Sequence, residues 1–135
     1  MAANVVRRDF RSEVRSALES RGGAAAHPRL TRFEERLSAA EHHDVYADDF
    51  ESQGRMGAAR AEARLAGEFY RDAAYAIIPP TALEPADLVL GDAAVRLMDA
   101  AGRAYQRGRS MKKAQRAYDL AERWASFNER ARLRF

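Results

Sequence analysis

The side chains that could bind a metal ion gather in residues 41–44, which read Glu-His-His-Asp. Neighbouring residues on a helix point about 100° apart, and neither the Glu-x-x-His nor the His-Glu-x-x-His spacing of helical metal sites occurs in the chain. Glu35, His42 and Asp49 share a helix face at seven-residue intervals, but successive members would lie about 10 Å apart. One ion cannot bridge that distance, so we predict a solvated polar stretch here and no metal site.

Nucleophilic and nucleotide-binding motifs are also missing from the sequence. The chain has no cysteine, and no serine lies in the Gly-x-Ser-x-Gly context of a nucleophile elbow. The Gly-x-x-x-x-Gly-Lys loop that holds nucleotide phosphates is absent as well. We therefore predict that the protein is not an enzyme, and that it has no catalytic residue and no cofactor.

The strongest binding signal is a row of cations near the C-terminal end, which we call the basic stripe: Lys112, Arg116, Arg123, Arg130 and Arg134. At 100° per residue these five side chains fall within about 40° of one another on a helix, over a length of roughly 33 Å. The stripe is interpreted first as a solvated helix face. Contact with nucleic-acid phosphates or with an acidic protein surface is the alternative.

The opposite side of the same helix is predicted to be apolar, and it consists of Met111, Ala114, Ala117, Tyr118, Ala121, Trp124 and Ala125. The aromatic residues are therefore expected to face the core rather than to alternate with the cations as stacking platforms for bases. Phosphate contact through this stripe would be independent of nucleotide sequence and strongly dependent on salt.

Composition predicts a single all-α domain. The 135 residues include 29 alanines and only ten Val, Ile and Thr residues together, and Arg outnumbers Lys by 21 to 2. Charge is distributed unevenly, since residues 27–54 carry three Arg against seven acids, whereas residues 103–135 carry ten Arg or Lys against three acids. The chain thus has an acidic middle and a basic end.

Apolar periodicity and helix-stop signals divide the domain, residues 1–135, into the following elements: helices at 4–21, 28–41, 55–78, 86–107 and 110–133, an acidic bend or short helix at 42–54, and a Pro-rich linker at 79–85. The second helix is expected to stop at residue 41 because continuing its apolar stripe would bury Asp44. Pro79 and Pro80 end the third helix, and Ser110 is the expected N-cap of the fifth. We predict a four- or five-helix bundle that ends in an exposed basic helix.

Small and aromatic residues recur at regular positions between residues 98 and 121: Met98, Ala101, Gly102, Tyr105, Ala114, Tyr118 and Ala121. This spacing resembles one tetratricopeptide repeat, in which small residues lie where two helices cross. Upstream, Gly67 and Tyr70 echo one part of the pattern. The resemblance implies that helices 86–107 and 110–133 form a closely packed antiparallel hairpin. The peptide groove of that repeat family is not implied, because the hairpins that would line it are missing.

Taken together, these features predict a structural protein or adaptor, an accessory subunit that docks through helical faces into an organelle complex, a phage or virus particle, or a secretion system. A nucleic-acid-associated protein that uses the basic stripe is the alternative. The longest apolar run, residues 73–78, is far shorter than the roughly 20 residues that cross a bilayer, so we expect a soluble protein without a membrane span. We expect it inside the cell or inside a large assembly. No secretory signal is recognised, and the mitochondrial matrix stays open as a compartment.

Overall fold

The computed structural model describes residues 8–135, so residues 4–7 of the first expected helix lie outside the described part. Within this part, the regular structure is entirely helical and has five elements: α1 Arg8–Arg21, α2 Ala26–Ser52, α3 Met56–Ile77, α4 Pro85–Arg107 and α5 Met111–Arg132. Gly22 and Gly23, with φ of 64° and 82°, end α1 in the left-handed conformation that glycine adopts without strain.

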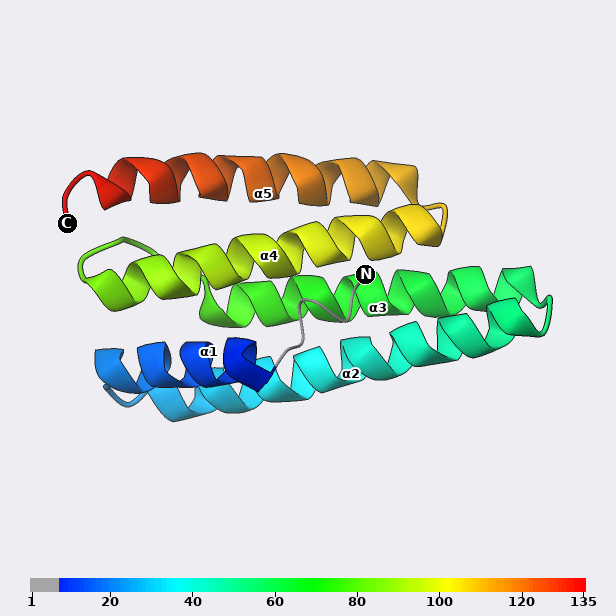
Figure 1. Cartoon of the computed structure of the whole chain (residues 1–135), viewed down its shortest axis with the longest axis horizontal. Coiled ribbons are helices and arrows are strands. Elements are labelled where there is room, and N and C mark those ends of the chain that lie inside the picture. Colours follow the sequence, from blue (N-terminus) through cyan, green and yellow to red (C-terminus); the bar gives the residue numbers. More distant parts are fainter. Residues whose placement is uncertain (1–7) are drawn as a thin grey trace.

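Helices α1 to α4 form an up-and-down bundle, and α5 is added to its outer side (Figure 1). Helix α2 packs on α3, α3 packs on α4, and α1 packs against both α4 and α2. Helix α5 packs on α4 and runs antiparallel to it. The predicted all-α bundle with a C-terminal helical hairpin is therefore confirmed.

The core contains a few large apolar side chains, and alanine fills the remaining contacts. The largest side chains that are essentially inaccessible to solvent come from all four helices of the bundle and include Val14, Leu18, Phe33, Leu37, Tyr70, Ile77, Leu90, Leu97 and Met98. Burying a side chain of this size contributes roughly 1.5–3 kcal/mol. The alanines of α3 and α4 that lie between them let the helix axes come close together.

Helix α2 is continuous from Ala26 to Ser52, so the bend or short helix that we predicted at 42–54 is wrong. Asp44, the residue that breaks the apolar stripe, does point inward, but the Tyr70 hydroxyl of α3 donates a 2.5 Å hydrogen bond to its carboxylate. A buried polar group that has a hydrogen-bond partner is tolerated in a helix contact. The amphipathic pattern therefore continues through α2 with polar contacts in place of apolar ones.

His43 helps to hold the second half of α2 against α3. Its ring stacks on the ring of Phe69 with centroids 5.3 Å apart, and its Nδ1 atom lies 2.5 Å from a carboxylate oxygen of Glu62. Both partners belong to α3. The histidine that suggested metal chemistry in the sequence is thus part of the α2–α3 contact.

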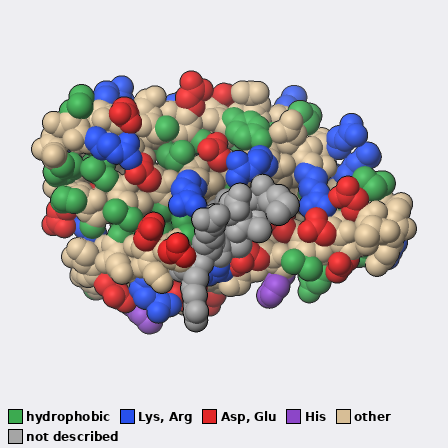
Figure 2. Space-filling view, viewed as in Figure 1, with side chains coloured by type: hydrophobic (Ala, Val, Ile, Leu, Met, Phe, Trp, Pro, Cys, Tyr) green, Lys and Arg blue, Asp and Glu red, His purple; other side chains and the backbone are tan. Residues whose placement is uncertain are grey.

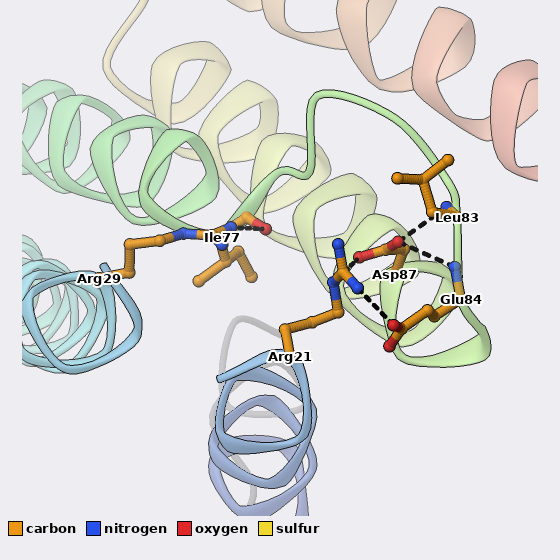
Figure 3. A network of polar contacts seen from close by, with 6 residues as sticks. All are labelled: Arg21, Arg29, Ile77, Leu83, Glu84 and Asp87. Atoms are coloured by element: carbon orange, nitrogen blue, oxygen red, sulfur yellow. Dashed lines mark hydrogen bonds and ion pairs between the residues drawn. The ribbon is translucent and has the colours of Figure 1, made fainter. Parts of the chain in front are cut away.

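The turn before α4 is held by the buried carboxylate of Asp87 (Figure 3). One of its oxygens accepts hydrogen bonds from the backbone amides of Leu83 and Glu84, at 2.8 and 3.0 Å. The other oxygen lies 3.0 Å from the Arg21 guanidinium, which also pairs with Glu84 at 2.7 Å. This network joins the end of α1 to the start of α4, and it satisfies amides that have no helical partner.

Arg29 of α2 provides hydrogen bonds to backbone groups at the same end of the bundle (Figure 3). Its guanidinium donates hydrogen bonds to the carbonyls of Ala76 and Ile77, at 3.1 and 2.9 Å. Pro79 and Pro80 carry no backbone N–H, so carbonyls in the last turn of α3 need donors from elsewhere. The predicted Pro-rich stop therefore depends on an arginine almost 50 residues earlier in the sequence.

The turn between α4 and α5 differs from the expectation at Ser110. Its side chain makes no capping hydrogen bond, and its backbone amide instead donates to the carbonyl of Tyr105 at 2.8 Å. The residue with positive φ is Arg109, at 62°, whereas Gly108 has an ordinary φ of −79°. Gly108 is needed for a different reason, because a Cβ atom there would lie 2.5 Å from the Cγ atom of Arg64 on α3.

Two glycines let aromatic rings of the next helix lie directly on the helix backbone. A Cβ atom at Gly67 would lie 2.8 Å from the ring of Tyr105, and one at Gly102 would lie 2.6 Å from the ring of Tyr118. The Gly-x-x-Tyr spacing that resembles a tetratricopeptide repeat therefore marks the α3–α4 and α4–α5 contacts.

We expect Gly102→Ala to lower the free energy of unfolding by about 1–3 kcal/mol, because the added methyl group overlaps the Tyr118 ring. The matched control is Gly57→Ala in the first turn of α3, where an added Cβ atom meets no atom within 4 Å. This change should raise stability by up to about 1 kcal/mol through better helix propensity. Urea unfolding of the two variants measures both effects, and equal stabilities would contradict the close α4–α5 contact.

Candidate functional site

Helix α5 is attached to the bundle by a narrow row of small residues. Its buried side chains are Ala114, Ala117, Ala121, Asn128 and Ala131, all of which face α4. The rest of the helix surface remains open to solvent or partly so. A helix that is held along one edge in this way can present a long face to a partner.

The structure places all five residues of the basic stripe, from Lys112 to Arg134, on the exposed side of α5 and the turn that follows it. Among residues 8–135, none of them forms an ion pair with a carboxylate. Figure 2 also shows Lys and Arg side chains at the end of the molecule where α4 turns into α5. The stripe predicted from the spacing is therefore exposed and not neutralised within the described part of the chain.

The acidic middle of the chain behaves differently, because most of its carboxylates are bonded to neighbouring helices. Five of its seven acids have partners within the bundle: Glu34 with Arg15, Glu41 with Arg11, Asp44 with Tyr70, and both Asp48 and Glu51 with Arg107. The other two, Glu35 and Asp49, are exposed on the outer side of α2. The acids of the middle segment are thus mostly paired within the bundle, whereas the five cations of the basic stripe on α5 and the turn after it are not.

A border of apolar side chains lies beside the basic stripe. At 100° per residue, Leu120 and Phe127 fall between the buried row of α5 and the stripe, whereas Trp124 falls within the buried row, between Ala131 and Ala117. Leu120 and Trp124 are half-buried, and Phe127 is 36% exposed. The Trp124 ring meets the exposed Tyr75 ring of α3 edge-on, with centroids 5.7 Å apart. We call these four residues the apolar border.

The apolar side predicted for α5 is wrong at one margin. Met111 and Ala125 are exposed, whereas Tyr118 and Trp124 are half-buried and pack against the core as predicted. The physical reason is that α5 packs mainly on α4, so its buried face is narrower than that of a helix inside a bundle. Toward α3 the helix is linked by an ion pair, since Lys113 Nζ lies 2.6 Å from a Glu68 carboxylate oxygen.

Carboxylates lie beside the basic stripe. Asp119 and Glu122 line a shallow depression on the outer face of α5 together with Arg123, Ser126 and Arg130. Gln115 donates a 2.8 Å hydrogen bond to the Asp119 carboxylate. A surface of this mixed composition suits a partner that carries both charged and apolar groups, and it is less suited to a uniform row of phosphates.

The histidines lie on α2, and purple side chains are visible in Figure 2 along the edge of the molecule that this helix forms. No three His, Asp or Glu side chains within residues 8–135 come close enough together to hold a metal ion. Glu35, His42 and Asp49 are exposed at successive turns along α2.

The hydrogen bond between Tyr70 and Asp44 was not predicted from the sequence. Burial raises the pKa of Asp44 above its usual range, and the hydrogen bond from Tyr70 offsets part of that rise. Burial and the neighbouring carboxylate raise the pKa of Tyr70 as well, so the phenol stays protonated as the donor. The break in the apolar stripe at Asp44 was the available signal, but only the packing of α3 on α2 identifies Tyr70 as the partner.

Comparison with protein-family models, with curated proteins and with solved structures found no match to this chain. Within residues 8–135, no helix combines the length and the hydropathy needed to cross a membrane.

We expect Tyr70→Phe to lower the free energy of unfolding by about 1.5–3 kcal/mol at pH 7, because the ionised Asp44 loses its donor. This hydrogen bond favours the ionised carboxylate, so the loss should shrink as the pH falls through the raised pKa of Asp44. Chemical unfolding of the parent and the variant at several pH values measures this loss of unfolding free energy. Tyr75→Phe, at a residue that is 53% exposed, serves as the control and should change stability by less than about 0.5 kcal/mol. A loss that does not depend on pH would contradict the assigned hydrogen bond.

Proposed function

We propose that the protein is a non-catalytic adaptor or accessory subunit that docks through α5 onto an acidic protein surface within a larger assembly. The observation that carries this proposal is the basic stripe, which has no internal partner among the described residues and lies beside the half-exposed apolar border. The settings we propose are an organelle complex, a phage or virus particle, or a secretion system.

The combination of charge and apolar surface supports protein docking better than charge alone does. A single exposed ion pair contributes only about 0–1 kcal/mol, so cations by themselves give steering and orientation more than affinity. Tryptophan and arginine are the residues that most often dominate binding energy in interfaces. On α5, Trp124 lies one residue after Arg123 and is still partly accessible.

The second candidate function is sequence-independent binding of nucleic acid, and the unpaired cations of the basic stripe favour it. Its length of roughly 33 Å corresponds to about ten base pairs of duplex DNA. Asp119 and Glu122 weaken this candidate because they line the same outer face as Arg123 and Arg130 and would repel phosphates.

A three-residue variant, Arg116→Gln with Arg123→Gln and Arg130→Gln, tests the proposal. We expect it to weaken binding to an acidic amphipathic helical peptide by about tenfold or more, as three exposed charge contacts are lost. Fluorescence anisotropy measures the affinity. The control carries the same total charge change elsewhere, at the exposed residues Arg32, Arg55 and Arg103, and should bind the peptide as the parent does.

The same protein samples are then titrated with a labelled duplex DNA of about 20 base pairs at about 50 and 200 mM salt. The docking proposal predicts little DNA binding. It is contradicted if the parent binds DNA tightly with a steep salt dependence while the peptide does not bind. That result would establish the second candidate, provided that the three-residue variant removes DNA binding.

A further inference from the structure

A cavity of about 180 Å³ lies at the end of the bundle opposite the Asp87 network. The α2–α3 turn and the α4–α5 turn are both at this end of the molecule, and the α2–α3 turn extends farther out (Figure 1). The residues that line the cavity come from the end of α2, the start of α3, the end of α4 and the α4–α5 turn, and they are Glu51, Met56, Ala59, Arg60, Arg107 and Arg109. The cavity belongs neither to the basic stripe nor to the apolar border.

Three guanidinium groups from separate segments line this small volume. Arg107 is already engaged, because Asp48 and Glu51 lie 2.7 and 2.6 Å from its guanidinium. Arg60 and Arg109 form no ion pair within residues 8–135. The lining therefore keeps an excess of positive charge, with one arginine held in place by carboxylates and two that have free donors.

The backbone at Arg109 is held in the left-handed region. Its φ of 62° costs a residue with a Cβ atom about 1–2 kcal/mol. Glycine is the usual residue at such a position, yet the glycine of this turn is at 108, where α3 comes too close for a side chain. The turn therefore places an arginine, and not a glycine, at the cavity, and strained residues are common at binding sites.

We propose that this cavity binds a phosphate group. Arg60 and Arg109 donate charge-assisted hydrogen bonds to it, and Arg107, which is held by its ion pairs, forms one side of the site. Planar guanidinium groups match the oxygen geometry of phosphate, and such hydrogen bonds are about twice as strong as those between neutral groups. The volume is large enough for one tetrahedral oxyanion together with a few water molecules. The site is independent of the proposed docking through α5.

The test is a titration of the isotopically labelled full chain with inorganic phosphate at constant ionic strength, followed by amide NMR. Saturable shifts are expected in the two turns, around residues 53–60 and 107–110. Arg109→Gly should be folded at least as stably as the parent, because it removes the left-handed strain, and it should bind phosphate about tenfold or more weakly. Arg60→Gln should weaken binding to a similar extent.

Arg130→Gln, in the basic stripe and outside the cavity, is the matched control and should bind phosphate as the parent does. A parallel titration with phenyl phosphate distinguishes the source of the group. Saturable binding of both anions supports a site for phosphate monoesters, and binding of inorganic phosphate alone supports a site for the free anion. The proposal is overturned if the shifts equal those caused by chloride, or if Arg109→Gly binds phosphate as the parent does.

Discussion

The close approach of neighbouring helices is the constraint on which the rest of this structure depends. The chain has 29 alanines and few large apolar side chains, so a well-packed core requires helix axes that lie near one another. Glycine at positions 67 and 102 and alanine along α3, α4 and α5 make that possible. The same row of alanines holds α5 against α4 while leaving most of its circumference uncovered. The exposed basic helix is thus a consequence of how the core is built.

Within residues 8–135, α1 covers 14 residues and α2 covers 27, so the described part of α1 lies beside only part of α2. The half of α2 beyond α1 has Asp44 against Tyr70 and His43 against Glu62, and the ion pairs of Arg107 with Asp48 and Glu51 tie it to α4. These contacts neutralise most of the acidic middle inside the molecule. Arg132 of α5 pairs with Asp92 of α4, but the five cations of the basic stripe have no carboxylate partner among the described residues. The outer face of α5 therefore keeps cations that the fold does not pair.

The two ends of the bundle are organised in opposite ways. At one end Asp87 and Arg29 satisfy backbone groups that the loops leave without partners, and the ion pair of Arg21 with Asp87 closes the network. At the other end, Arg109 lines a cavity from a strained backbone position. The first arrangement stabilises the fold. The second arrangement leaves guanidinium groups at the cavity without carboxylate partners, as is usual in a binding site.

The sequence by itself determined the helical class, the helix stops at Gly22 and Pro79, the close α4–α5 hairpin and the outward direction of the basic stripe. Each follows from residues close together in the chain, because helical periodicity and backbone chemistry are local properties. Only the tertiary structure decided that Asp44 could lie half-buried against Tyr70, that Trp124 would stay partly exposed and that Arg109 would adopt a positive φ. These outcomes depend on which helix lies opposite, and a helical pattern shows which residues share a face without showing what that face meets.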